Sequence, residues 1–222
     1  MGRNRYPEVT ESRILEMAMK LFIEKGYEQT TLQDIADAIG MTRGAIYHHF
    51  KDKAEMVDSV MACMFHKTVP CYDEILGNKE ISSLEKIRQI LIHALTAKEQ
   101  VDVYFPLSKS LVYNPKLSAA YLDFTKNNLV AIFSELIIEG VEDGSIRVKE
   151  PEIMAELLAV ILNIWLSPII FMDSKEKFIA KLSYASDILD SVGLPIINQE
   201  VNAAFEKIIS TLPDHEGEES TE

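Results

Sequence analysis

Side chains suited to recognising a nucleic acid are concentrated between positions 31 and 53. Arg43 carries a planar guanidinium whose parallel N–H groups can donate to both acceptors of one guanine. Tyr47 and Lys53 can donate to phosphate oxygens, and Lys53 stands where the N-terminus of a fourth helix would add its dipole. The adjacent His48 and His49 invite a metal-binding or pH-sensing interpretation, but no metal-spaced cluster accompanies them. These residue types therefore favour contact with DNA over catalysis.

The same stretch has the periodicity of two short helices folded against each other. The first helix has an apolar face at spacings i, i+3, i+4 and i+7, formed by Leu32, Ile35, Ala36 and Ile39. Gly40 follows, where the end of a helix favours the left-handed conformation that glycine adopts most easily. Beyond Met41 a second helix begins, with an apolar face formed by Ala45, Ile46 and Phe50. Two short helices joined by such a turn predict a helix-turn-helix, whose second helix enters the major groove.

A third helix must cover the apolar faces of these two, because so small a unit cannot bury them alone. The preceding segment, about 10–25, supplies it, with Thr10 as a plausible N-cap and Gly26 at its end. Its apolar stripe consists of Ile14, Leu15, Ala18, Leu21 and Phe22. Further N-terminal caps are expected at Thr31 with Asp34 and at Asp52 with Glu55.

The window from about residue 10 to residue 56 resembles the N-terminal DNA-binding domain of the TetR (tetracycline repressor) family without any gap. The matching residues are Gly26-Tyr27, Thr30-Thr31, Ile35-Ala36, Gly40, Arg43-Gly44-Ala45-Ile46-Tyr47 and His49-Phe50-Lys51-x-Lys53. The remaining three quarters of the chain carries no motif that can be matched, which is typical of that family.

The resemblance implies an all-α protein with an N-terminal three-helix helix-turn-helix DNA-binding domain and a C-terminal helical ligand-binding and dimerisation domain. We place the first domain at 1–53, the effector-binding and dimerisation domain at 54–213, and an acidic, disordered tail at 214–222. The implied function is that of a homodimeric, ligand-responsive transcriptional regulator. It would act as a repressor that binds a palindromic DNA operator and is released by an unidentified small molecule. The alternative is a DNA-binding protein of the same fold that is controlled by a protein partner.

Carried over by position, the expected DNA-binding residues are Thr31, Gln33, Thr42, Arg43, Gly44, Ala45, Tyr47, His48 and Lys53. Arg43 is the expected guanine contact, and Gly44 would let the backbone approach the DNA closely. Thr31, Tyr47 and Lys53 resemble the phosphate anchors of the family. His49 is expected to pack or cap locally.

The rest of the chain has helical periodicity and no strand-like alternation. Helices are expected at about 53–76, interrupted at Pro70, and at 82–99, 102–113, 115–142, 151–172, 175–192 and 198–212. The segment from Leu157 to Met172 is apolar on all sides, which suits a helix with its own core on one face and a partner on the other. The dimer interface is predicted at Leu158, Ile161, Leu162, Phe178, Leu182, Ala185 and Leu189. A helix in the centre of a large monomer core is the alternative.

Methionines, aromatic residues and two amides suggest where an effector pocket could form. The candidates are Met61, Met64, Phe65, Tyr104, Phe105, Tyr113, Phe124, Asn128, Asn163 and Trp165. Plain core packing is the alternative for each of them. Asn128 and Asn163 are the sharper candidates, because an amide among apolar neighbours needs a hydrogen-bonding partner.

The composition is that of a soluble globular protein, with a formal net charge of −13 over 222 residues. Between positions 1 and 53, eight basic residues balance eight acidic ones, so the remainder carries the whole negative charge. Neither a signal peptide nor a membrane span is expected, and Cys63 and Cys71 are expected to be free thiols in a reducing cytoplasm. Cys63 with His66 is at most half a metal site. No nucleophile–base motif or glycine-rich phosphate loop appears, so we expect no enzyme, cofactor or metal.

Overall fold

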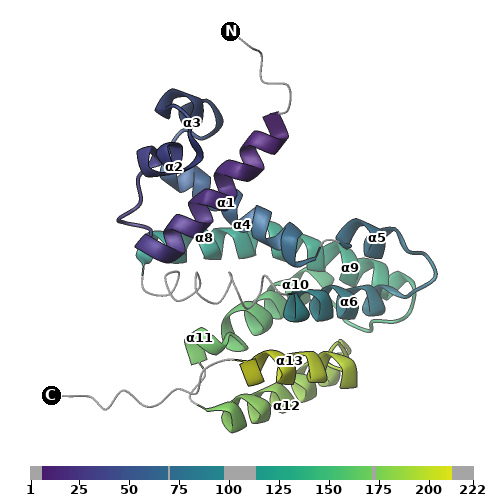
Figure 1. Cartoon of the computed structure of the whole chain (residues 1–222). Helices are drawn as coiled ribbons and strands as arrows, with labels where there is room; N and C mark the ends of the chain where they lie inside the picture. Colours follow the sequence, from purple (N-terminus) through teal and green to yellow (C-terminus); the bar gives the residue numbers. More distant parts are fainter. Residues whose placement is uncertain (1–6, 70, 98–113, 172–173, 212–222) are drawn as a thin grey trace, which may run out of the picture. The chain divides into compact units, whose positions relative to one another are not determined.

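The computed structural model describes residues 7–69, 71–97, 114–171 and 174–211. These residues form helices joined by short turns, with no strand among them, which confirms the all-α prediction. The expected helix at 102–113 and the expected tail at 214–222 lie outside this range. The chain divides into two compact units, which we call the head and the body, and Figure 1 labels their helices. Of the described residues, the head contains 7–67 and 114–124, and the body contains 68–69, 71–97, 125–171 and 174–211.

The head consists of the first helices and of one helix that comes much later in the chain. Its elements are α1 (Pro7–Lys25), α2 (Leu32–Ile39), α3 (Arg43–His49), α4 (Lys53–Thr68) and α8 (Pro115–Phe124). Helix α1 already begins at Pro7, so the predicted N-cap at Thr10 is wrong. A proline is well suited to a first helical position, where its missing N–H would have no partner in the helix.

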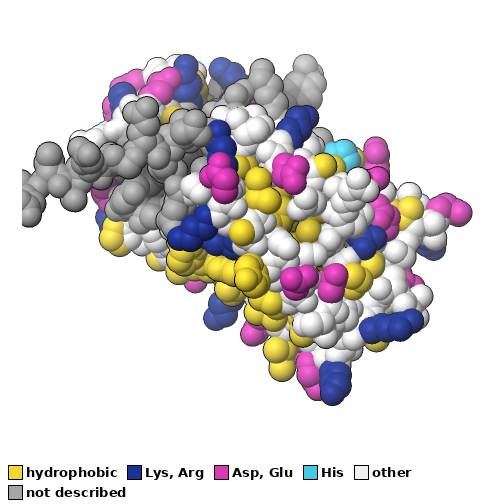
Figure 2. All heavy atoms as spheres, turned by 90° about the horizontal axis from the view of Figure 1, so that it is seen from below, with side chains coloured by type: hydrophobic (Ala, Val, Ile, Leu, Met, Phe, Trp, Pro, Cys, Tyr) yellow, Lys and Arg dark blue, Asp and Glu magenta, His cyan; other side chains and the backbone are white. Residues whose placement is uncertain are grey.

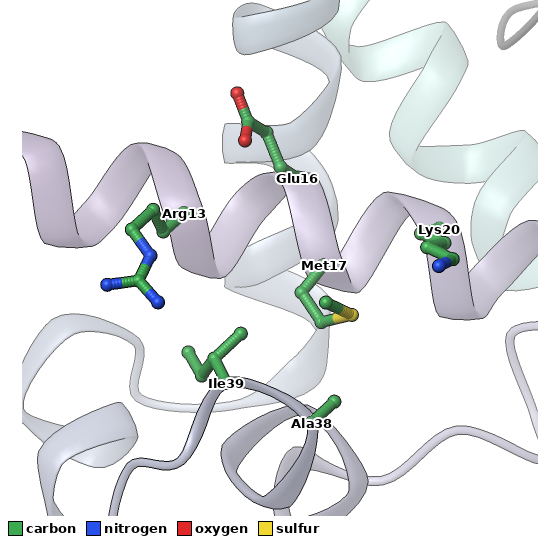
Figure 3. A pocket seen from close by; sticks show the side chains of 6 residues that line it. All are labelled: Arg13, Glu16, Met17, Lys20, Ala38 and Ile39. Atoms are coloured by element: carbon green, nitrogen blue, oxygen red, sulfur yellow. The ribbon is translucent and has the colours of Figure 1, made fainter.

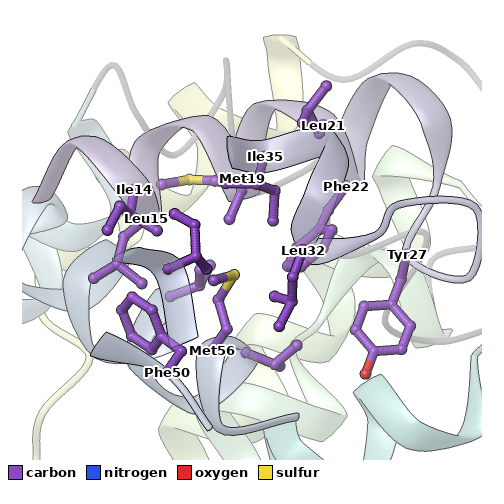
Figure 4. Packing of buried hydrophobic residues seen from close by; sticks show 14 of the residues in the cluster. Ile14, Leu15, Met19, Leu21, Phe22, Tyr27, Leu32, Ile35, Phe50 and Met56 are labelled. Atoms are coloured by element: carbon purple, nitrogen blue, oxygen red, sulfur yellow. The ribbon is translucent and has the colours of Figure 1, made fainter. Parts of the chain in front are cut away.

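The core of the head is formed by side chains that converge from α1, α2, α3 and α4 (Figure 4). Phe22, Ile35, Ile46 and Met56 are almost completely buried there. Leu117 of α8 belongs to the same core with 1% of its surface exposed, and Ala120, Tyr121 and Phe124 pack against it. The head is therefore larger than the predicted domain at 1–53, because its core also uses α4 and α8.

The first turn of α8 is also tied to the loop between α1 and α2. The amide Nδ2 of Asn114 donates to Oε1 of Glu28 at 3.2 Å, and the ammonium of Lys116 lies 3.6 Å from the same oxygen. Asn114 also caps α8, because its Oδ1 accepts the backbone N–H of Lys116 at 3.0 Å. An apolar anchor and a polar one thus hold α8 to the head.

The body contains the remaining helices, in which two single π-helical turns interrupt the α-helices. Its elements are α5 (Tyr72–Gly77), α6 (Ser83–Thr96), η2 (Thr125–Leu129), α9 (Val130–Glu142), α10 (Pro151–Val160), η3 (Ile161–Trp165), α11 (Pro168–Phe171), α12 (Lys175–Ser191) and α13 (Gln199–Thr211). The expected break at Pro70 is confirmed, since α4 ends at Thr68 and α5 begins at Tyr72. The expected helix at 115–142 is present as α8, η2 and α9 in uninterrupted succession.

Helix α9 packs against α6 and α10, and α13 packs against α6 and α12. An ion pair joins α6 to α9: the ammonium of Lys86, whose side chain is 4% exposed, lies 2.6 Å from Oε1 of Glu139, whose side chain is 49% exposed. Ser83 donates from its hydroxyl to Oε2 of the same carboxylate at 3.2 Å. The Glu139 carboxylate therefore accepts hydrogen bonds both from the buried ammonium of Lys86 and from the hydroxyl of Ser83, the first residue of α6.

Candidate nucleic-acid interface

A reciprocal cap marks the start of α2, the first short helix of the helix-turn-helix. The Thr31 hydroxyl accepts the backbone N–H of Asp34 at 3.1 Å, and the Asp34 carboxylate accepts the backbone N–H of Thr31 at 2.8 Å. Hydrogen bonds from the hydroxyl and backbone of Thr31, and then from Lys25, lower the pKa of Asp34 to about 2. Gly40 ends α2 with a φ of 69°, in the left-handed region predicted for it. The caps predicted at Thr31 and Gly40 are confirmed.

Helix α3 turns its apolar side chains into the head and its polar side chains outwards. Ile46 and Phe50 are buried, whereas Arg43, Gly44, Tyr47 and His48 are exposed. At its start, the Thr42 hydroxyl accepts the backbone N–H of Ala45 at 3.2 Å. The outer face of α3 is therefore available to a ligand along its whole length.

Arg43 and Tyr47, one turn apart on this face, contact each other. Nη2 of Arg43 donates to the Tyr47 hydroxyl oxygen at 3.0 Å. The guanidinium carbon lies 5.2 Å from the centre of the Tyr47 ring, within the range of cation–π attraction. Although 43% of Tyr47 is exposed, the side chain is thus engaged with the arginine.

The other residues that we expect to contact DNA differ in their surroundings within the head. Gln33 donates through Nε2 to Oδ1 of Asp37 at 2.7 Å, and Ala45 is half-buried. The His48 ring meets that of His49 edge-on at 5.6 Å. A Cβ added at Gly44 would meet no protein atom within 4 Å, so the chain itself does not require glycine at this position. The roles predicted for these residues on DNA stay predictions.

Lys53 occupies an interior position that its expected role as a phosphate anchor does not explain. Its ammonium donates to the carbonyl oxygens of Tyr27 at 2.7 Å and Thr30 at 3.0 Å. It also lies 4.0 Å above the centre of the Tyr27 ring. Burial lowers the pKa of Lys53 below its ordinary value, and the nearby Glu28 carboxylate acts in the opposite direction. The side chain therefore fastens the start of α4 to the loop between α1 and α2.

Replacing Lys53 with methionine is expected to lower the free energy of unfolding of the head by about 1–3 kcal/mol, because two carbonyls of buried residues lose their donor. Lys51→Met is the matched control, since Lys51 is exposed and lies two positions earlier. This control should keep its stability and bind all duplexes more weakly, with a flatter salt dependence. Urea denaturation and fluorescence anisotropy with labelled duplex DNA measure the two effects. A Lys53→Met protein with unchanged stability but reduced affinity would show that this ammonium acts on phosphate instead.

An open groove of about 360 Å³ lies between α1 and α2, away from the outer face of α3 (Figure 3). Its lining residues are Arg13, Glu16, Met17, Lys20, Ala38 and Ile39. Met17 extends towards Ala38, whereas Glu16 points away from α2. Lys20 lies 3.8 Å from Glu24 on its own helix. The groove has charges of both signs at its rim and no convergent set of hydrogen-bond donors. It therefore does not have the character of a phosphate-binding site.

The structure describes the side chains of only some of the predicted effector-lining residues. Met61 is buried in the head core, and Phe124 packs against that core. The structure does not describe the side chains of Met64 and Phe65. Tyr104, Phe105 and Tyr113 also lie outside the described part of the chain. The effector pocket stays a prediction.

The two amides singled out for that pocket differ from each other in their surroundings. Asn128, on η2, is exposed, which corrects the expectation that it lies among apolar neighbours. Asn163, on η3, is half-buried and donates through Nδ2 to the carbonyl of Ala159 at 3.1 Å. Trp165, in the same π-helical turn, is also half-buried. A helical amide can thus be satisfied by the preceding turn of its own helix.

Most residues predicted for the dimer interface face the interior of the body. Leu162 is half-buried, and the buried ones are Leu158, Ile161, Phe178, Leu182, Ala185 and Leu189. The same helices carry large hydrophobic side chains that are exposed: Ile153, Leu157 and Val160 on α10, and Ile179, Tyr184 and Ile188 on α12, with Val192 directly after its end. This corrects the choice of residues, because a partner would meet only the outer positions.

The part of the head that the sequence did not predict is α8, which comes late in the chain. Asn114, just before α8, and Lys116 contact Glu28 in the loop before the helix-turn-helix, and Leu117 of α8 lies in the head core. Yet Asn114 lies 86 residues after Glu28 in the chain. Leu117 has no local signature that distinguishes it from other leucines of amphipathic helices. Only the tertiary structure reveals its place.

Two short capped helices with an exposed, donor-bearing second helix define a helix-turn-helix DNA-binding protein. Residues 14–60 match the profile described as "Bacterial regulatory proteins, tetR family". The chain belongs to the TetR family and is a DNA-binding transcriptional regulator.

Similar proteins extend this comparison beyond the head. The chain is 30% identical over 145 residues to the HTH-type transcriptional repressor KstR2 of Mycolicibacterium smegmatis, covering 64% of this chain and 69% of that protein. It is 32% identical over 139 residues to KstR2 of Rhodococcus jostii, covering 61% and 67%. A TetR-family regulator from Rhodococcus sp. superimposes with a TM-score of 0.62 at 20% identity, covering 83% of this chain and 99% of that one, which supports the fold.

Two absences concern the described part of the chain. It contains no group of three or more His, Cys, Asp or Glu side chains arranged to hold a metal ion. None of its helices is long and apolar enough to cross a membrane.

Proposed function

We propose that the protein is a homodimeric transcriptional repressor that binds a palindromic operator and releases it when a small molecule binds the body. The observation that carries the DNA-binding part is the outer face of α3, where Arg43, Tyr47 and His48 are exposed on a helix whose inner face is buried. The relatives from Mycolicibacterium and Rhodococcus are named as repressors, which supports the direction of control. Such a regulator acts on the chromosome, in the cytoplasm.

The surface of the body supports a dimer. One α3 spans only a few base pairs, so a long site needs two heads about 34–36 Å, or a multiple of that, apart on the DNA. Figure 2 shows hydrophobic side chains gathered on one face of the molecule, the side on which α12 lies. Tyr184 and Ile188 on α12, and Val192 directly after its end, are exposed at intervals of four residues. A two-fold pairing of α10 and α12 with their copies would cover these side chains.

The test is selection of bound duplexes from a random pool with the purified full chain at a fixed salt concentration, followed by sedimentation of the complex. We expect an inverted repeat whose half-sites lie about one helical turn, or a multiple of it, apart, bound by an even number of chains. Recovery of no enriched sequence would refute operator binding. An unrepeated site bound by one chain would refute the dimer.

Release is tested separately, with the selected duplex and a library of small molecules. A compound that raises the melting temperature of the free protein should also lower its affinity for the duplex, because it must favour one arrangement over the other. The fluorescence of Trp165, the single tryptophan of the chain, reports on the body during this titration. If a protein partner dissociates the complex and no stabilising compound does, control by a small molecule is refuted.

A further inference from the structure

We infer that Tyr47 is a positioning residue for base recognition: its hydroxyl holds the Arg43 guanidinium in the orientation in which Arg43 reads a guanine. This inference rests on the proposed function, in which the outer face of α3 lies in the major groove. It assigns Tyr47 a part in sequence discrimination in addition to any contact with phosphate.

Tyr47 restrains the Arg43 guanidinium through two contacts, one with its hydroxyl and one with its ring. Nη2 donates to the tyrosine hydroxyl at 3.0 Å, while the guanidinium carbon stays 5.2 Å from the ring centre. Arg43 is the first residue of α3 and Tyr47 lies four positions later, so both side chains project from the same face. An exposed arginine without such a partner would sample many rotamers, and binding would have to immobilise it.

The hydrogen bond to Tyr47 leaves the base-reading capacity of Arg43 intact. A guanidinium has five N–H groups, and Nη2 carries two of them. If Tyr47 takes the hydrogen on the Nε side, the parallel pair from Nη1 and Nη2 remains for guanine O6 and N7. If it takes the other hydrogen, the parallel pair from Nε and Nη2 remains. Either way one bidentate edge stays free, and Tyr47 decides which one.

Tyr47 still has a proton to donate, because its oxygen accepts the bond from Arg43. A DNA phosphate could accept that proton, which would link the backbone contact to the base contact. A tyrosine that served only phosphate would weaken binding to every sequence equally. A tyrosine that positions Arg43 would matter only where Arg43 reads its base.

The test replaces Tyr47 with phenylalanine, which keeps the ring and removes the hydroxyl. The probes are the duplex selected from the random pool and a duplex in which the base pair read by Arg43 is changed; Arg43→Ala identifies that pair by its lost preference. Releasing one immobilised arginine is expected to weaken binding to the selected duplex about 2- to 12-fold per half-site. Binding to the changed duplex should weaken less, by no more than a contact of the Tyr47 hydroxyl with phosphate contributes. In an Arg43→Ala chain, Tyr47→Phe should weaken both duplexes equally and by no more than that amount.

Two other measurements complete the test. NMR relaxation of the Arg43 Nε–H group in the free protein should show a less restrained side chain in Tyr47→Phe. Circular dichroism should show an unchanged fold, because Tyr47 is an exposed residue. Equal weakening on both duplexes, persisting in the Arg43→Ala background with a flatter salt dependence, would show a phosphate contact only and overturn the inference. Unchanged affinity would also overturn it, as would an Arg43→Ala chain that keeps every base preference, whereas failure to select any sequence would refute the proposed function itself.

Discussion

Leu117→Ala is expected to destabilise the head by about 2–5 kcal/mol, the range found when a fully buried leucine is truncated. Leu117 is 1% exposed and lies in the same core as Phe22 and Met56. Because packing around α8 cannot collapse freely, the lost contacts leave a cavity in the head. A change at position 117 should therefore disturb helices that lie nearly a hundred residues earlier in the sequence.

Hydrogen exchange followed by mass spectrometry locates this effect. Peptides from α1 and α4 should exchange at least about 30-fold faster in the variant, if their protection depends on the cooperative unfolding of the head. Leu122→Ala is the matched control, because Leu122 lies on the same helix with 51% of its surface exposed. The urea transition of Trp165 fluorescence should remain in place, since this residue belongs to the body. Unchanged exchange in α1 and α4 would show that α8 is dispensable to the head.

Arg43→Ala is expected to cost about 1–3 kcal/mol of discrimination at one base pair of each half-site, and therefore about twice that for the two heads of a dimer. The loss should appear on the selected duplex and be small on a shuffled one, because a guanine contact carries sequence information. Arg43→Lys should be intermediate, since an ammonium keeps the charge but lacks the fork that matches guanine.

Fluorescence anisotropy at one fixed salt concentration measures these affinities. Lys51→Met provides the comparison, because loss of an exposed charge should weaken both duplexes alike. The opposite pattern, an Arg43→Ala protein that binds both duplexes equally more weakly, would place Arg43 on the phosphate backbone. The base contact would then have to come from other residues of α3.

The local features of the helix-turn-helix could be predicted because they depend on neighbours in the sequence. Residue types a few positions apart predict the capping box of Thr31 and Asp34, the left-handed conformation of Gly40 and the burial of Ile46. The start of α1 was placed too late, because Thr10 looks like a cap only when the suitability of Pro7 for a first helical position is overlooked. Helix ends are the least determined part of such patterns.

Distant contacts escaped the same reasoning. Lys53 donates to the carbonyl oxygens of Tyr27 and Thr30, which lie 26 and 23 residues earlier in the chain. The sequence around Lys53 therefore does not indicate these hydrogen bonds. On α12, periodicity identifies apolar positions but not what covers them. Leu182 and Leu189 face the core of the body, while Ile188 is exposed. Both kinds of position satisfy the same hydrophobic pattern.

The discontinuous make-up of the head limits how it can be transplanted. A chimera cut after the helix-turn-helix and joined to the remainder of a relative would carry that relative's own residues in place of Asn114, Lys116 and Leu117. The helix-turn-helix of one parent would then pack against the α8 helix of another, even though each parental fragment was intact. Hybrid regulators made from this scaffold should therefore carry two separate segments, the N-terminal one through α4 and the short one at α8, from a single parent.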